Sequence, residues 1–114
     1  MVNIDHAYAN GTVSGATVAA YVEVLTIDNC AGALIQISNT DTAAVNKDLK
    51  YKISGYLSAH ASCVETAIVS ETTLAEDAAS GVLSDVNRPY AKVVVSIKSG
   101  ESTATTYQVD WIAY

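Results

Sequence analysis

Residues 49–58 alternate at every position between two sets of side chains, and this period-two pattern constrains the fold more than any other feature. The first set is Leu49, Tyr51, Ile53, Gly55 and Leu57, and the second is Lys50, Lys52, Ser54, Tyr56 and Ser58. Because successive side chains of a β-strand point to opposite faces, the pattern predicts a strand with one buried and one solvated face. Gly55 inside this strand predicts either a β-bulge or a close approach of another part of the chain.

Other segments with strand patterns are spread along the chain and separated by turn residues. They are residues 2–8, 16–27, 33–38, 64–70, 82–83, 90–98 and 105–112. Asn10-Gly11 accepts the positive φ angles of a type I′ turn, which predicts a β-hairpin after the first segment. Residues 72–84 fit either a capped helix or a loop with a short strand, and Ser80-Gly81 favours the loop. Pro89 is expected to precede a strand.

Seven to eight short strands without a substantial helix predict an all-β fold. We expect one antiparallel β-sandwich domain spanning residues 1–114, with jelly-roll or Ig-like topology. Residues 16–27 are apolar on both expected faces, which is more apolar surface than a single small sandwich needs for its core. Residues 1–9 are a candidate inter-subunit strand, because an extended terminal segment pairs as readily with a neighbour's sheet edge as with its own.

The charge balance excludes several classes of partner. The chain has a net charge of −6, and only 16% of its residues are charged. An acidic protein repels phosphate groups and anionic lipid, so we expect neither nucleic-acid nor membrane binding. The basic residues form two loose groups, Lys47, Lys50 and Lys52 and then Arg88, Lys92 and Lys98. We interpret both groups as solvated strand faces and protection of sheet edges. The first residues lack the pattern of a secretory signal, so we expect a chain used without export, the alternative being a leader that was removed with Met1 added.

Residues with catalytic or metal-binding chemistry are few. His60 and Cys63 lie three residues apart in an expected turn, which favours surface residues over a thiol–imidazole pair. Asp41, Asn46 and Asp48 lack the spacing and glycine of a calcium loop. The sequence therefore predicts no enzyme, no cofactor and no metal site. For Cys30 and Cys63 we expect two small buried thiols, with a single disulfide between them as the alternative.

The aromatic side chains are the remaining candidates for a binding surface. Tyr51, Tyr107 and Trp111 share faces with aliphatic residues and are expected in the core. Tyr56 lies on the opposite face, where an exposed ring could stack on a sugar or anchor a protein contact. The candidate interface residues are Ile4, His6, Tyr8, Tyr21, Leu25 and Tyr56.

Residues 34–114 resemble small β-sandwich structural proteins of tailed bacteriophage virions, of the kind that decorate capsids. The resemblance lies in residues 35–40, 49–56, 65–74 and 89–99. It implies a non-catalytic homo-oligomeric subunit, often trimeric, that contacts itself and a capsid or other structural protein. It also implies a virion location after synthesis in the host cytoplasm, with an extracellular filament or surface as the alternative. The competing hypothesis is a monomeric carbohydrate-binding module that uses Tyr56.

Overall fold

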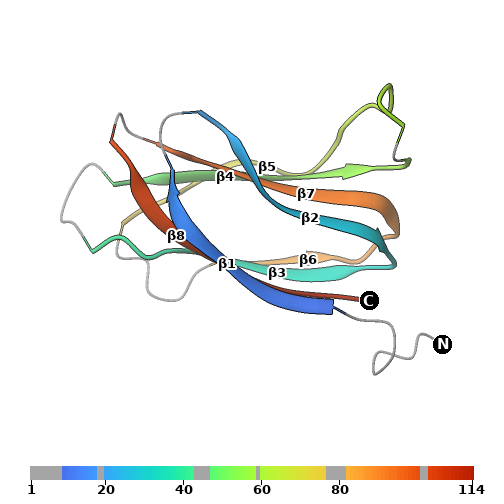
Figure 1. Cartoon of the computed structure of the whole chain (residues 1–114), viewed down its shortest axis with the longest axis horizontal. Helices are drawn as coiled ribbons and strands as arrows, with labels where there is room; N and C mark the ends of the chain where they lie inside the picture. Colours follow the sequence, from blue (N-terminus) through green and yellow to red (C-terminus); the bar gives the residue numbers. More distant parts are fainter. Residues whose placement is uncertain (1–8, 18–19, 43–46, 59, 77–81, 101–102) are drawn as a thin grey trace.

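The computed structural model describes residues 9–17, 20–42, 47–58, 60–76, 82–100 and 103–114. These residues form eight β-strands, and no helix occurs among them (Figure 1). The strands are β1 (Ala9–Thr17), β2 (Val22–Cys30), β3 (Ala33–Asn39), β4 (Leu49–Tyr56), β5 (Thr66–Leu74), β6 (Val82–Val86), β7 (Tyr90–Ser99) and β8 (Thr105–Ala113). The expected all-β class is confirmed.

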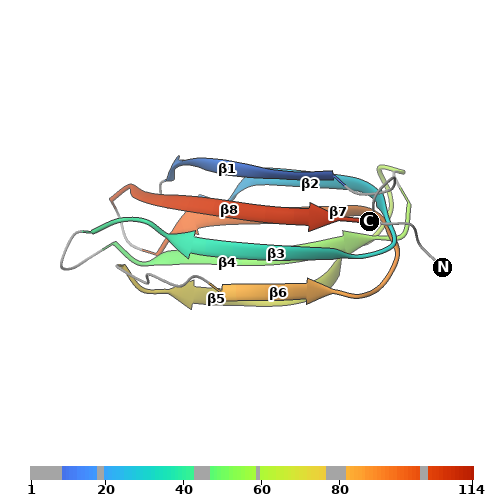
Figure 2. The ribbon, with the colours of Figure 1, turned by 90° about the horizontal axis from the view of Figure 1, so that it is seen from below.

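The strands form two facing four-stranded sheets, in the orders β1-β8-β3-β6 and β2-β7-β4-β5 (Figures 1 and 2). Every pair of neighbouring strands is antiparallel. The first strand pairs with the last, β2 with β7, β3 with β6 and β4 with β5. This is one long hairpin rolled up on itself, with the β4–β5 connection at its tip. The topology is therefore the jelly roll, the first of the two sandwich types that we expected.

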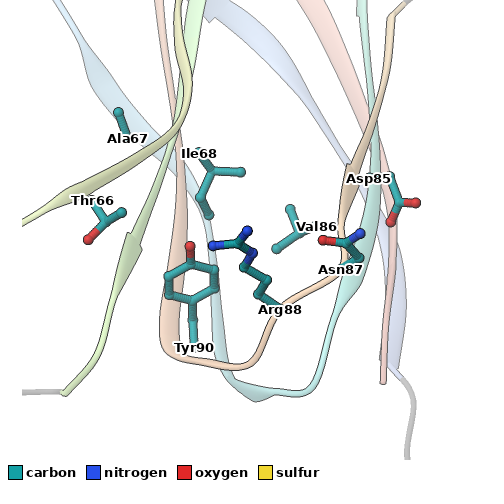
Figure 3. A pocket seen from close by; sticks show the side chains of 8 residues that line it. All are labelled: Thr66, Ala67, Ile68, Asp85, Val86, Asn87, Arg88 and Tyr90. Carbon is teal, nitrogen blue, oxygen red and sulfur yellow. The ribbon is translucent and has the colours of Figure 1, made fainter.

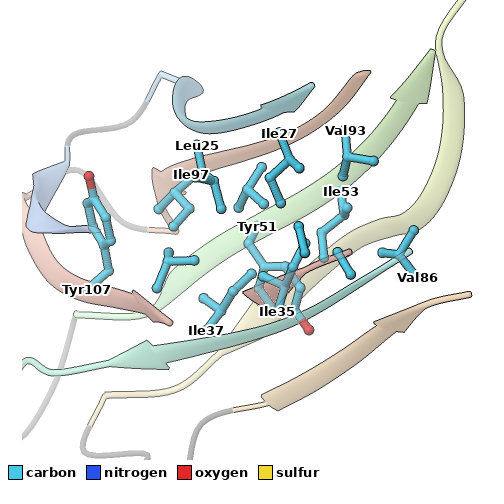
Figure 4. Packing of buried hydrophobic residues seen from close by; sticks show 14 of the residues in the cluster. Leu25, Ile27, Ile35, Ile37, Tyr51, Ile53, Val86, Val93, Ile97 and Tyr107 are labelled. Atoms are coloured by element: carbon cyan, nitrogen blue, oxygen red, sulfur yellow. The ribbon is translucent and has the colours of Figure 1, made fainter. Parts of the chain in front are cut away.

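Aliphatic side chains from both sheets fill the space between them (Figure 4). The fully enclosed positions recur at every second residue of β3, β4 and β7 and include Ile35, Ile37, Leu49, Ile53, Val93, Val95 and Ile97, each 0% exposed. Burying one such side chain stabilises the fold by about 1.5–3 kcal/mol. Tyr51 and Tyr107 belong to this core and Trp111 packs against it, as predicted.

The first third of the chain differs from the prediction. Asn10 and Gly11 lie inside β1, opposite Ile112 and Trp111 of β8, so the predicted hairpin turn at these residues is wrong. Residues 16–27 are also not one strand, because β1 ends at Thr17 and β2 begins at Val22. In both places pairing with a distant strand overrides the local preference. The strand predicted over residues 2–8 lies outside the described residues.

Later predictions agree with the structure. Pro89 directly precedes β7, where its missing N–H removes no ladder hydrogen bond. The described part of residues 72–84 contains the end of β5 and the start of β6 but no helix. The C-terminal strand β8 is central, between β1 and β3. The N–H groups of Ala31 and Gly32 donate to the Tyr114 carbonyl, which fixes the end of the chain.

Candidate functional site

The basic side chains gather on one outer face. Lys50 and Lys52 lie on β4, and Lys92 and Lys98 lie on β7, which are the two inner strands of their sheet. They line the outer face, opposite the core, so the predicted solvated strand face is observed. The predicted edge protection by these lysines is wrong, because the edges of this sheet are β2 and β5. We call these four lysines, with Tyr21, Tyr56, Glu65 and Glu71, the lysine face.

Tyr21 and Glu71 organise one half of the lysine face. The ammonium groups of Lys52 and Lys98 lie over the Tyr21 ring, 4.7 and 4.6 Å from its centroid. The Tyr21 hydroxyl donates a 2.6 Å hydrogen bond to Glu71 Oε2. This hydrogen bond, with Lys98 and Lys50 nearby, holds the pKa of Glu71 below its usual range. Burial and the adjacent Glu71 raise the pKa of Tyr21.

Tyr56 and Glu65 organise the other half. The Lys92 ammonium lies 4.4 Å from the centroid of the Tyr56 ring. Glu65 accepts hydrogen bonds from the hydroxyls of Ser54 at 2.8 Å and Tyr56 at 3.4 Å. Tyr56 is consequently half-buried, whereas the sequence suggested an exposed ring.

The long polar side chains also cover their own sheet. Val94 and Ser96 point away from the core, yet they are only 2% and 7% exposed. Lys52 and Ser54 are their direct neighbours across the sheet. Lysine stems readily cover apolar surface while the ammonium group stays solvated. The lysine face is therefore a closed layer of paired side chains, with no unpaired lysine among the four.

The β4–β5 loop carries the most exposed apolar side chains of the described residues. Leu57 is 76% exposed and Val64 is 81% exposed. His60 Nδ1 lies 2.8 Å from Ser62 Oγ, and Cys63 contacts His60 through its backbone N–H and the His60 carbonyl. The ring is therefore engaged with Ser62, and the described contacts include no thiol–imidazole pair.

Both cysteines are free thiols, so the alternative of a disulfide between them is not realised in this structure. Cys30 is buried, and burial raises its pKa. Cys63 is half-buried, so the expectation of a buried thiol holds only for Cys30. The backbone N–H and the hydroxyl of Ser58 lower the pKa of Cys63.

A pocket of about 280 Å³ opens between the edge strands β5 and β6 (Figure 3). Its lining residues are Thr66, Ala67, Ile68, Asp85, Val86, Asn87, Arg88 and Tyr90. Tyr90 and Ile68 form an apolar wall, and the Arg88 guanidinium projects between that wall and Asn87. The lining contains neither histidine nor cysteine, so it offers no nucleophile with an adjacent imidazole base.

Metal and membrane features are not found in the described part of the chain. No group of three histidine, cysteine or carboxylate side chains there is placed to hold a metal ion. Asn46, the middle member of the calcium set considered above, lies outside that part. Nor does that part contain an apolar helix of a length that would cross a bilayer.

The candidate interface residues fall into three groups. Ile4, His6 and Tyr8 lie outside the described residues. Tyr21 and Tyr56 lie on the lysine face. Leu25 is only 9% exposed and belongs to the core, because the register shifts between Glu23 and Leu25 and turns Leu25 inward. A role of these residues in an interface stays a prediction.

The sheet edges are the feature that the sequence could not reveal. The four edge strands are β1, β2, β5 and β6, and none of them contains lysine, arginine or proline. These residue types commonly prevent an edge from pairing with another chain. Three edges carry carboxylates, namely Glu23 and Asp28 on β2, Glu71 on β5 and Asp85 on β6, whereas β1 contains no charged residue.

The described residues form a jelly-roll domain with the lysine face on one sheet, a pocket between β5 and β6, and sheet edges that have no strand partner. No protein-family model matches the sequence, and no curated protein sequence matches it either. The structure is similar to a Bacillus endospore appendage protein, described as forming disulfide-linked pili, with a TM-score of 0.53 and 12% identity. That match covers 93% of this chain and 85% of the other.

Two further neighbours share the fold. One is VP2 of infectious bursal disease virus in a subviral particle, with a TM-score of 0.54 and 9% identity. It covers 93% of this chain but only 32% of VP2, so this chain spans about a third of that protein. The other is the Yersinia pseudotuberculosis-derived mitogen, with a TM-score of 0.51, 15% identity and coverage of 93% and 86%. At these identities the likeness concerns the fold alone, and none of the three is a bacteriophage protein.

Proposed function

We propose that this protein is a non-catalytic structural subunit that associates with copies of itself in a shell or filament. The observation that carries this proposal is the edge strand β1, whose nine residues include no charged residue and no proline. A soluble monomer usually blunts such edges, because unpaired N–H and C=O groups accept a strand from another chain. Here four of the six basic residues lie on inner strands instead.

The kind of assembly is supported by two likenesses. The resemblance of residues 34–114 to capsid-decorating proteins favours a virion subunit that contacts a capsid protein. The pilus protein, which matches this chain along most of both lengths, supports an extracellular filament or surface as the alternative. The similarity to VP2, which was solved in a subviral particle, supports assembly of this fold into a shell. We favour the virion, with the filament as the second candidate.

The predicted inter-subunit strand was residues 1–9, and because Ala9 already pairs with Ala113, we propose that residues 1–8 add a strand to a neighbouring subunit, with Ile4, His6 and Tyr8 in contact. The alternation of these residues suits a strand, and an extended segment binds a free edge through main-chain hydrogen bonds. Deleting residues 1–8 should then reduce the size of the assembly while the sandwich stays folded. An unchanged assembly would exclude this role.

The glycan-binding alternative receives less support. Sugar stacking needs an open aromatic face, and the Lys92 ammonium already lies over the Tyr56 ring. A glycan array with the purified protein tests this alternative. Specific glycan binding that is lost in Tyr56→Ala would support it.

Electron microscopy of the purified full chain tests the proposed function. Shells, rings or filaments with a regular repeat are expected, either from the protein alone or after mixing with capsid particles. Uniform small monomeric particles under all these conditions would overturn the proposal.

A further inference from the structure

Three of the four edge strands carry features that hinder pairing with an identical edge. On β2, Glu23 and Asp28 are acidic, and the register shifts between Glu23 and Leu25. The β5 strand contains Glu71 and is irregularly paired, with register shifts on both sides of Ile53. The β6 strand is only five residues long and contains Asp85. Like charges directly opposite each other destabilise a strand pair, so two copies of these edges repel.

The β1 strand has none of these features. It is nine residues long, and its sequence contains neither a charged residue nor proline. Its pairing with β8 is unbroken from Ala9 opposite Ala113 to Thr17 opposite Thr105. Its other side has no strand partner in the described part of the chain, so the backbone groups of alternate residues point outward there. Figure 2 shows β1 and β2 at one margin of the sandwich and β5 and β6 at the other.

We propose that β1 pairs antiparallel with β1 of a second copy, around a two-fold axis near Val13. Such a contact uses the same surface on both copies, which is the commonest arrangement in homo-oligomers. The two sheets then become one continuous sheet in the order β6-β3-β8-β1-β1-β8-β3-β6. This inference rests on the proposed self-association and identifies the surface that mediates it.

A second copy's β1 fits this edge better than its β6 does. Two β1 strands match in length along all nine residues, whereas the five residues of β6 leave four residues of β1 unpaired. The β1 strand itself brings no carboxylate into the strand pair, in a chain whose net charge is −6. It also leaves the lysine face and the pocket between β5 and β6 uncovered.

Opposite charges at Ser14 provide the test. Ser14 lies opposite the uncharged Gln108 and next to the proposed axis. In Ser14→Lys the lysines of the two copies become diagonal neighbours across the strand pair and repel each other. The two glutamates of Ser14→Glu repel each other in the same way. We expect each variant alone to self-associate about five-fold more weakly than the wild type. An equal mixture of the two should associate at least as tightly as the wild type, because the charges across the axis are then opposite.

A lysine introduced on β5, at the margin of the sandwich opposite β1, is the matched control for Ser14→Lys. Ala67 is exposed on β5 and lies opposite Ser54, so Ala67→Lys adds the same charge to an edge that the proposal leaves free. It should leave self-association unchanged. Circular dichroism and thermal unfolding verify that all variants keep the fold, and analytical ultracentrifugation measures the dissociation constants.

The outcomes separate the inference from the proposed function. If the wild type self-associates and neither Ser14 variant weakens it, the β1 contact is wrong while the structural role stands. If both variants weaken it and the mixture does not recover, β1 binds a different edge, and the two-fold contact is wrong. If the wild type remains monomeric at every concentration, the proposed function and this inference both fail.

Discussion

The ring of Tyr90 lies directly against the α-carbon of Gly55, and a Cβ atom at residue 55 would overlap the ring carbons. Gly55 lies on β4 and Tyr90 begins β7, its neighbour in the sheet. The glycine that interrupts the alternating pattern of β4 thus provides space for an aromatic ring. Of the two explanations given for this glycine from the sequence, close approach accounts for it directly. The same ring forms a wall of the pocket between β5 and β6.

Gly55→Ala is therefore expected to lower the free energy of unfolding by about 1–3 kcal/mol, the usual cost of an overpacked site. Chemical denaturation measures the change. In a Tyr90→Ala background the same substitution should cost clearly less, because the ring that the new methyl group meets is gone. An equal cost in both backgrounds would mean that Tyr90 is not the obstacle.

Asn39 ties together three segments at the end of the sandwich. Its side-chain amide donates to the carbonyls of Lys47 at 2.8 Å and Leu74 at 3.1 Å, and its Oδ1 accepts from the backbone N–H of Asp41 at 3.0 Å. The side chain is only 3% exposed. Asn39→Ala should lower the free energy of unfolding by about 1–3 kcal/mol, because buried backbone groups lose these partners.

Thr40→Ala serves as the control for Asn39. Thr40 is exposed, and its hydroxyl makes one hydrogen bond, to Thr106 Oγ1. Its removal should change the unfolding free energy by less than about 1 kcal/mol. Equal effects at the two positions would argue against a special role for Asn39.

The Tyr21–Glu71 contact predicts a pH dependence. The pKa of Glu71 in the folded protein is lowered, first by the Tyr21 hydroxyl and then by Lys98 and Lys50. An unfolded glutamate has a pKa of about 4.3, so the ionised carboxylate stabilises the fold above that pH. This contribution is lost as the pH falls through the lower pKa of the folded state.

Tyr21→Phe removes the hydrogen bond and should shift the Glu71 titration midpoint upward, toward that of an unfolded glutamate. Carbon-detected NMR of the Glu71 carboxyl during a pH titration measures this midpoint in the wild type and in Tyr21→Phe. Ser54→Ala, which removes a hydrogen bond to Glu65 and none to Glu71, should leave the Glu71 midpoint unchanged. A Glu71 midpoint that does not move in Tyr21→Phe would contradict the assigned cause.

The two thiols should differ in reactivity. The pKa of Cys63 is lowered by Ser58, whereas burial raises the pKa of Cys30. Since the thiolate is the reactive form, Cys63 should be alkylated first, at a rate that rises with pH around a midpoint lower than that of an ordinary thiol. Cys30 should react only on unfolding. Mass spectrometry after timed iodoacetamide treatment distinguishes the sites, and equal rates would refute the assignment.

The alternation of residues 49–58 predicted β4 and the position of Pro89 predicted the start of β7, because both are local signals. Asn10-Gly11 misled for the same reason. Its local turn preference is real, but pairing with β8, about a hundred residues away, decides its structure. The misplaced edge protection has another cause, since alternation identifies a strand's faces but not its place within a sheet. Lys52 and Lys92 lie on the outer face of the sheet, as expected, but they lie on its inner strands and not on its edges.

The candidate site was harder to predict than the fold. Tyr21 and Tyr56 were singled out as aromatic residues, but their lysine and glutamate partners come from other strands. Leu25 was selected as a candidate interface residue, and the structure places it in the core, where one register shift on β2 turns it inward. Asn39 was not singled out from the sequence, because its partners at Lys47 and Leu74 become neighbours only when the two sheets meet.

Self-association through the sheet edges is tested by sedimentation velocity of the full chain over a wide concentration range. We expect a species of at least twice the 11.9 kDa subunit mass to dominate as the concentration rises. A single 11.9 kDa species at every concentration, with the fold intact by circular dichroism, would contradict it.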